Sequence, residues 1–274
     1  MYKVLIIGCG SQGCFADAPS SGCESKVISF AKAFSEHPKM FDVYVTDLDI
    51  VAVELAIKTW GFQMHEFGVK YDVIVVTTPD ETHFDILKNI PFMNPGVRLV
   101  VCEKPMCMTS VECEKIISLY EEHKIPILVN YTRRFIPYLI ALKKNGTAVN
   151  GSVTFNRGWE HTGTHAIDFF NMFDCKNVEY KFIKKNDERI WNLMIQFQNG
   201  YVFKECRGED DPVPHYYDFH TRYVIKNILG FLENKEPLLC TMYDAIKSIK
   251  IMEEKKDGIR QKRSGRSKKS SSKG

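Results

Sequence analysis

Short apolar runs alternate with segments of helical character through the first half of the chain. The runs are rich in β-branched residues and lie at residues 4–7, 43–46, 73–77, 99–102 and 127–130. The segments between them predict helices near residues 24–37, 50–60, 83–88 and 110–123. Because strands and helices alternate, the pattern predicts right-handed crossovers and a parallel, doubly wound α/β sheet.

The pattern changes after about Lys144. Short strand-like segments separated by turn signals lie at residues 151–158, 178–185, 191–200 and 201–206 and predict a smaller, mainly antiparallel open sheet. Further helices are expected near residues 164–173, 222–233 and 242–255. We therefore predict a doubly wound α/β domain at residues 1–130, a smaller α+β domain at 131–256 and a tail at 257–274.

Composition and charge narrow the class of protein. The 274 residues are 44% apolar and 26% charged, which is ordinary for a soluble globular protein. No run approaches the roughly 18 apolar residues of a membrane span, and the nine cysteines include no C-x-x-C pair. We expect a cytoplasmic protein with reduced thiols and no membrane partner. The basic tail carries seven Lys/Arg against one acid, so we expect it to be disordered, and the rest of the chain offers no basic stripe for specific nucleic-acid binding.

A glycine-rich loop follows the first predicted strand. Gly8, Gly10 and Gly13 have the G-x-G-x-x-G spacing, with Ser11 and Gln12 between them, and the position after a strand favours a dinucleotide site. The distance from this loop to Asp47, at the end of the second strand, is longer than usual. We expect an insertion before the helix, which would restart at a capping box formed by Ser21 and Glu24. Asp47 would bind the adenosine ribose and favour NAD over NADP, with Asp49 as the competing candidate.

Three further stretches carry candidate chemistry. "VVTTPDETHFDI" places Thr77, Thr78 and Pro79 at the carboxyl end of a strand, and "VVCEKPMCMT" does the same for Glu103, Lys104 and Pro105. Ligands bind at such strand ends in doubly wound sheets. "HTGTHAIDFF" puts His161, His165 and Asp168 on or beside a helix of the second domain. A positioned lysine and a histidine can form a proton relay beside a nicotinamide.

In these stretches the chain resembles the Gfo/Idh/MocA oxidoreductase family, named for glucose–fructose oxidoreductase and inositol dehydrogenase. The similarity covers most of residues 1–256 and also includes "NYTRRFIP" and "FLENKEPLLCTMYDAIKSIKIM". It implies a Rossmann domain, an open-faced sheet domain, and hydride transfer between a nicotinamide and a carbon of a sugar or polyol. By position, Lys104 would bond the reacting hydroxyl and His165 would move its proton. The resemblance extends the cofactor set to Thr77, Thr78, Pro79, His83, Glu103 and Lys104, and the substrate set to Asn130, Arg133, His161 and Asp168.

The chain departs from the family pattern at two places. His161 stands where many members have an acid, four residues before the catalytic histidine. The second domain also looks abridged, so its pocket is either open or completed by another subunit, and we expect a homo-oligomer formed through the C-terminal sheet.

Two other interpretations of these residues stay open. His161 and His165, with His215, His220 or Asp168, could hold zinc, although Gly163 between the histidines disfavours a helix there. We predict no metal site. Alternatively, the protein could bind a dinucleotide as a sensor or scaffold without turnover. Retention of both Lys104 and His165 favours the enzyme.

Overall fold

A computed structural model describes residues 1–19, 21–155, 158–159, 163–183, 191–206 and 219–255. The first half forms a six-stranded sheet in which every described pairing is parallel, with strand order β3-β2-β1-β4-β5-β6. The strands are β1 (Tyr2–Ile7), β2 (Phe41–Thr46), β3 (Gln63–Met64), β4 (Val73–Val76), β5 (Leu99–Glu103) and β6 (Ile127–Asn130). This order and direction confirm the predicted doubly wound sheet.

The central strands are buried on both faces, as their unbroken apolar sequences require. All residues of β4, β5 and β6 are buried, and β-branched side chains dominate β4. Since the strands are parallel, the loops that follow β1, β2, β4, β5 and β6 all leave the sheet at one edge. This edge gathers the glycine loop, Asp47, Thr77 and Lys104.

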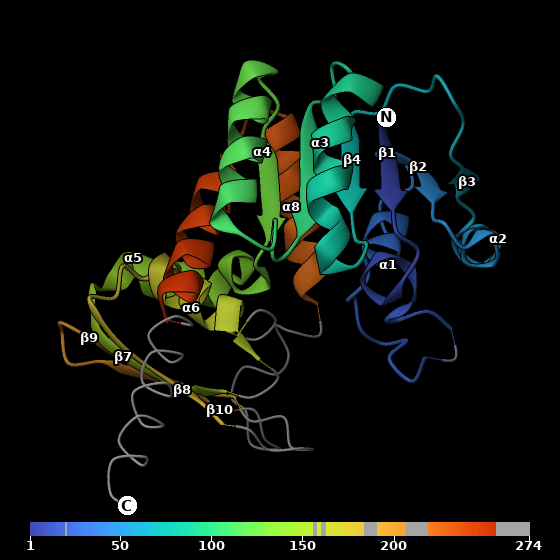
Figure 1. Cartoon of the computed structure of the whole chain (residues 1–274). Coiled ribbons are helices and arrows are strands. Elements are labelled where there is room, and N and C mark those ends of the chain that lie inside the picture. The colour runs from blue at the N-terminus through green and yellow to red at the C-terminus, as the bar shows by residue number, and fades with distance from the viewer. Residues whose placement is uncertain (20, 156–157, 160–162, 184–190, 207–218, 256–274) are drawn as a thin grey trace, which may run out of the picture.

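Helices connect these strands and cover the sheet. They are α1 (Phe30–Ser35), α2 (Ile50–Trp60), α3 (His83–Met93) and α4 (Ser110–Glu122). Helix α4 begins with a capping box, in which Thr109 accepts from the amide of Glu112 and the carboxylate of Glu112 accepts from the amide of Thr109. In Figure 1, α3 and α4 lie in front of the sheet and α8 (His220–Leu232) lies behind it.

The second sheet has the order β10-β9-β7-β8. Its strands are β7 (Ala148–Phe155), β8 (Asn177–Phe182), β9 (Trp191–Phe197) and β10 (Val202–Cys206). The β9–β10 and β7–β9 pairs are antiparallel, but β7 and β8 are parallel. The parallel pair arises because α6 (Thr164–Met172) lies between β7 and β8 in the chain and returns it to the starting edge. The observed sheet is therefore mixed, with the antiparallel pairs in the majority.

One face of this sheet packs against α6. A Cβ on Gly151 of β7 would lie 2.2 Å from the ring of Phe170, so only a glycine leaves room for this ring to pack against the sheet. Phe169 lies 5.9 Å from Phe203, centroid to centroid. On β9, Asn192, Met194 and Gln196 alternate with buried residues and are exposed on the opposite face. The sheet therefore has one face covered by α6 and one open face, on which the described part of the chain places no helix (Figure 1).

The C-terminal helices return to the first sheet. Helix α8 contacts α1, and the side chain of Thr221 donates to the carbonyl of Ile28. A last helix spans residues 242–255, and Tyr243 in it donates to the carboxylate of Glu121 on α4. Helix α5 (Pro137–Asn145), which the sequence did not predict, joins the two sheets. No helix among the described residues is both long enough and apolar enough to cross a membrane.

Candidate functional site

The glycine loop is shaped by contact with the end of β4. Gly8 has a φ of +104°, and a Cβ there would lie 2.8 Å from the carbonyl carbon of Thr77. A Cβ on Gly13 would lie 2.0 Å from the carbonyl oxygen of Gly8. Both positions therefore exclude a side chain. A Cβ on Gly10 would meet no described atom within 4 Å, so the loop leaves the open space that a pyrophosphate needs to approach its backbone.

The chain after the loop departs from the predicted helix. Ser11 and Gln12 are exposed in a short π-helical turn that ends at Phe15, and α1 begins only at Phe30. The expected break between loop and helix is therefore present. The predicted restart at Ser21 and Glu24 is wrong.

Asp17 explains the late start of α1. Its side chain is 1% exposed and accepts hydrogen bonds from the amides of Ile28 and Ser29, at 2.5 and 3.0 Å, and from the hydroxyl of Ser29 at 2.5 Å. These bonds hold the backbone of Ser29 extended, and its hydroxyl caps the helix by accepting from the amide of Lys32. A buried carboxylate needs such partners, so the helix starts where Asp17 is satisfied.

Asp47 lies at the end of β2 and faces the glycine loop. One carboxylate oxygen accepts from the amide of Cys9 at 2.6 Å, and the other accepts from the amide of Asp49 at 3.0 Å. Asp49 itself is the N-cap of α2, where it accepts from the amide of Val51 at 2.9 Å. A carboxylate has about four acceptor positions, so Asp47 keeps acceptor capacity for a further donor.

The loop after β4 is tied to both the glycine loop and α3. Thr77 donates from its hydroxyl to the carbonyl of Gly8 at 2.7 Å. Thr78 is half-buried and Pro79 is exposed. His83 is fully buried and bonds the carbonyl oxygens of Thr78 and Pro105. This differs from the direct cofactor contact that the sequence predicted for His83, because both ring nitrogens already have protein partners.

Glu103 ends β5, and Lys104 follows it directly, beside the end of β6. Asn130 donates to the carboxylate of Glu103 at 2.6 Å, and Lys104 is 8% exposed. Burial raises the pKa of Glu103, while the hydrogen bond from Asn130 and the positive charge of Lys104 lower it. The Oδ1 atom of Asn130 is buried and has no hydrogen-bond partner among the described residues. The predicted lysine thus lies next to a buried carboxylate and an amide oxygen with spare acceptor capacity.

His165 reaches this region from α6. Its side chain is half-buried, and its ring lies 6.0 Å from the ring of Tyr131, edge to face at 88°. Tyr131 directly follows β6, so the histidine of the second domain lies near the strand end that carries Asn130.

Asp168 has a structural environment that the sequence did not predict. It is 1% exposed and pairs with Arg134, whose Nε lies 3.0 and 2.8 Å from its two oxygens. Ser248 also donates to it at 3.3 Å, and Arg134 makes a second ion pair with Asp244 at 3.2 Å. Its observed contacts are those of a structural ion pair and differ from the predicted contact with substrate. The neighbouring Arg133 is 4% exposed.

Some predicted residues lie outside the described part of the chain. They are His161, His215 and the tail at 257–274. Among the described residues, no group of three or more His, Cys, Asp or Glu side chains could hold a metal ion.

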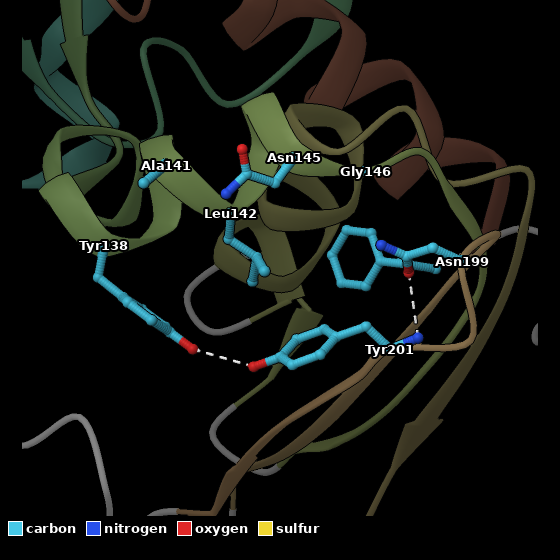
Figure 2. A pocket seen from close by; sticks show the side chains of 8 residues that line it. Tyr138, Ala141, Leu142, Asn145, Gly146, Asn199 and Tyr201 are labelled. Carbon is cyan, nitrogen blue, oxygen red and sulfur yellow. Dashed lines mark hydrogen bonds between the residues drawn. The ribbon is translucent and has the colours of Figure 1, made fainter.

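A cavity of about 280 Å³ lies elsewhere, between α5 and the turn that joins β9 to β10 (Figure 2). The hydroxyls of Tyr138 and Tyr201 meet across it at 3.1 Å. Neither these tyrosines nor the other lining residues belong to the predicted site. We place the candidate site at the carboxyl end of the parallel strands, because ligands of doubly wound sheets bind there.

Known proteins match this chain both in sequence and in fold. Residues 2–131 match the family model described as an oxidoreductase family with an NAD-binding Rossmann fold, GFO_IDH_MocA. The N-terminal domain belongs to the Gfo/Idh/MocA oxidoreductase family. A curated relative, the rhizopine catabolism protein MocA of Rhizobium meliloti, is 32% identical over 72 residues. That match spans 26% of this chain and 22% of the relative.

Solved structures match over both domains. A dehydrogenase from Chromobacterium violaceum matches with a TM-score of 0.72 over 98% of each chain, at 12% identity. The UDP-N-acetylglucosamine 3-dehydrogenase GnnA of Acidithiobacillus ferrooxidans matches with a TM-score of 0.66, covering 92% of this chain and 96% of its own, also at 12% identity. At such identities these matches show a shared fold, which includes the second, open-faced sheet.

Proposed function

We propose that this protein is an NAD(H)-dependent dehydrogenase or reductase that acts on a hydroxyl or carbonyl carbon of a sugar, polyol or sugar derivative. The observation that carries the proposal is Lys104 at the carboxyl end of β5, beside the buried Glu103–Asn130 hydrogen bond and on the same sheet edge as the glycine loop. The sugar-like substrate class is supported by the structural match to a UDP-N-acetylglucosamine dehydrogenase.

The residues of the first domain fit a dinucleotide. Gly10 leaves its backbone open to a pyrophosphate, and Ser11 and Gln12 are exposed beside it. Asp47 would accept from the ribose hydroxyls with its remaining acceptor positions and would repel a 2′-phosphate, which favours NAD over NADP. Thr77, Thr78 and Pro79 would border the nicotinamide end. When bound, the nicotinamide supplies the hydride acceptor or donor.

The chain's own side chains would manage the substrate proton. Lys104 donates to the reacting hydroxyl oxygen and holds it in place, and Glu103 compensates the charge of the lysine. His165 takes the hydroxyl proton during oxidation and returns it during reduction.

We propose residues 1–130 as the cofactor domain. We also propose the open face of the β7–β10 sheet as a surface for a second copy of the chain.

A substrate screen tests this function. Purified protein with NAD⁺ would be incubated with sugars, polyols and nucleotide sugars, and NADH formation followed by absorbance, with NADH binding measured in parallel by calorimetry. Turnover on any of these substrates supports the enzyme. Tight NADH binding with no turnover on any of these substrates would instead favour a dinucleotide sensor or scaffold of the same fold.

A further inference from the structure

His83 joins two loops of the candidate site through a single buried ring. Its side chain is 0% exposed, Nε2 lies 2.9 Å from the carbonyl oxygen of Thr78, and Nδ1 lies 2.8 Å from the carbonyl oxygen of Pro105. The first oxygen belongs to the loop after β4, and the second to the loop that carries Lys104. The ring therefore sets the spacing between these two loops.

Both partners of the ring can only accept hydrogen bonds. A neutral imidazole has one N–H group and one nitrogen lone pair, so it could donate to only one of the two carbonyls. The other nitrogen would then direct its lone pair at a carbonyl oxygen less than 3 Å away. An imidazolium has two N–H groups and satisfies both contacts.

The charged groups near the ring suit a cation. On β5, the carboxylate of Glu103 is buried; burial raises its pKa, and Asn130, Lys104 and His83 are among the groups that lower it. Lys104 is the neighbouring cation, and Asp80 lies in the turn that precedes α3. Glu103 thus lies within electrostatic range of both Lys104 and His83.

We propose that His83 is an imidazolium in the folded protein and acts as a positioning residue, donating from both nitrogens so that the loops carrying Thr78 and Lys104 stay in register. The catalytic consequence of this inference rests on the proposed function. The charge of His83 and its two hydrogen bonds do not depend on that function. Loss of one donor frees one loop from the other, and Lys104 then loses its fixed place beside Glu103.

Nitrogen NMR of the wild-type protein tests the charge state directly. In histidine-¹⁵N-labelled protein at pH 7, assigned with His83→Gln, the His83 ring should show two protonated nitrogens, each with its own N–H proton. One nitrogen with the signature of a lone pair would overturn the proposal. This readout needs no substrate.

The variant His83→Gln tests the positioning role, because its side chain carries a single donor nitrogen. In lysine-labelled protein assigned with Lys104→Arg, the Lys104 side-chain signal should move in His83→Gln. It should stay in place in the control His123→Gln, whose histidine is exposed at the end of α4. An unmoved Lys104 signal in a folded His83→Gln protein would refute the positioning role.

With a substrate available, turnover should fall about 10- to 100-fold in His83→Gln, a loss typical of a misplaced catalytic group, while the NADH dissociation constant changes much less. An unchanged turnover would also contradict the role. If the protein proves not to be an enzyme, the substrate screen fails while both NMR results still stand, so the two failures are distinguishable.

Discussion

Asp168→Asn separates a structural role for this residue from a substrate-binding one. The substitution keeps the shape of the side chain but removes the negative charge that faces Arg134 at 2.8 Å. Removing one partner of a buried ion pair costs about 3–5 kcal/mol, because the remaining charge is left uncompensated. Arg134 retains Asp244 at 3.2 Å, and the side chain of Asp244 is 27% exposed, so we expect the lower end, about 3 kcal/mol.

Urea unfolding, monitored by circular dichroism, measures this loss in the free energy of unfolding. A thermal melt should show a fall in Tm of roughly 6–12 °C. The matched control is Glu36→Gln, which removes the partner of Arg222 from a pair whose side chains are 47% and 29% exposed. An exposed pair contributes only about 0–1 kcal/mol, so the control should melt close to the wild type. Asp168→Asn with wild-type stability and a raised KM would refute the structural reasoning and restore the substrate role.

Three further substitutions test the cofactor domain. Asp47→Ser should narrow the preference for NAD(H) over NADP(H) in calorimetry, and tighter NADP(H) binding by the wild type would contradict the assignment of this acid. Gly10→Val should abolish NADH binding without lowering Tm, because a Cβ there meets no described atom within 4 Å; a variant that still binds NADH would disprove the loop assignment. Burial raises the pKa of Glu103, so the folded protein binds this proton more tightly than the unfolded chain, and wild-type stability should fall as pH rises above about 4.3. In urea titrations, the loss of stability between pH 4 and pH 7 should be smaller in Glu103→Gln than in the wild type, because buried Asp168 also has a raised pKa, and an identical pH dependence would contradict this prediction.

The sequence predicted the parallel sheet well because its strands are continuous apolar runs. The ends of α2 were predicted at residues 50 and 60 and were found there, since Asp49 caps its start and Gly61 ends it with a φ of +72°. Those signals are local, and local signals can be read without tertiary structure. The edge strand β3 consists of only two residues, both exposed, so it has no hydrophobic pattern that could predict it.

The errors arose where a distant contact decided the outcome. The start of α1 depends on Asp17, whose partners lie 11 and 12 residues further along the chain, and a capping-box pattern at Ser21 was the stronger local signal. Asp168 lies one turn after His165 on α6, so its position suggested the site. Its partner Arg134 is 34 residues away and could not be identified from spacing.

We propose above that Lys104 and His165 carry out the proton chemistry beside a bound nicotinamide. The most direct test of this proposal is turnover and NADH affinity of Lys104→Ala and His165→Ala, measured on a substrate found by the screen. Each variant should lose about 10²–10⁴ in turnover, as expected for loss of an acid–base group, while NADH binding changes little. Full turnover in both variants would contradict the account.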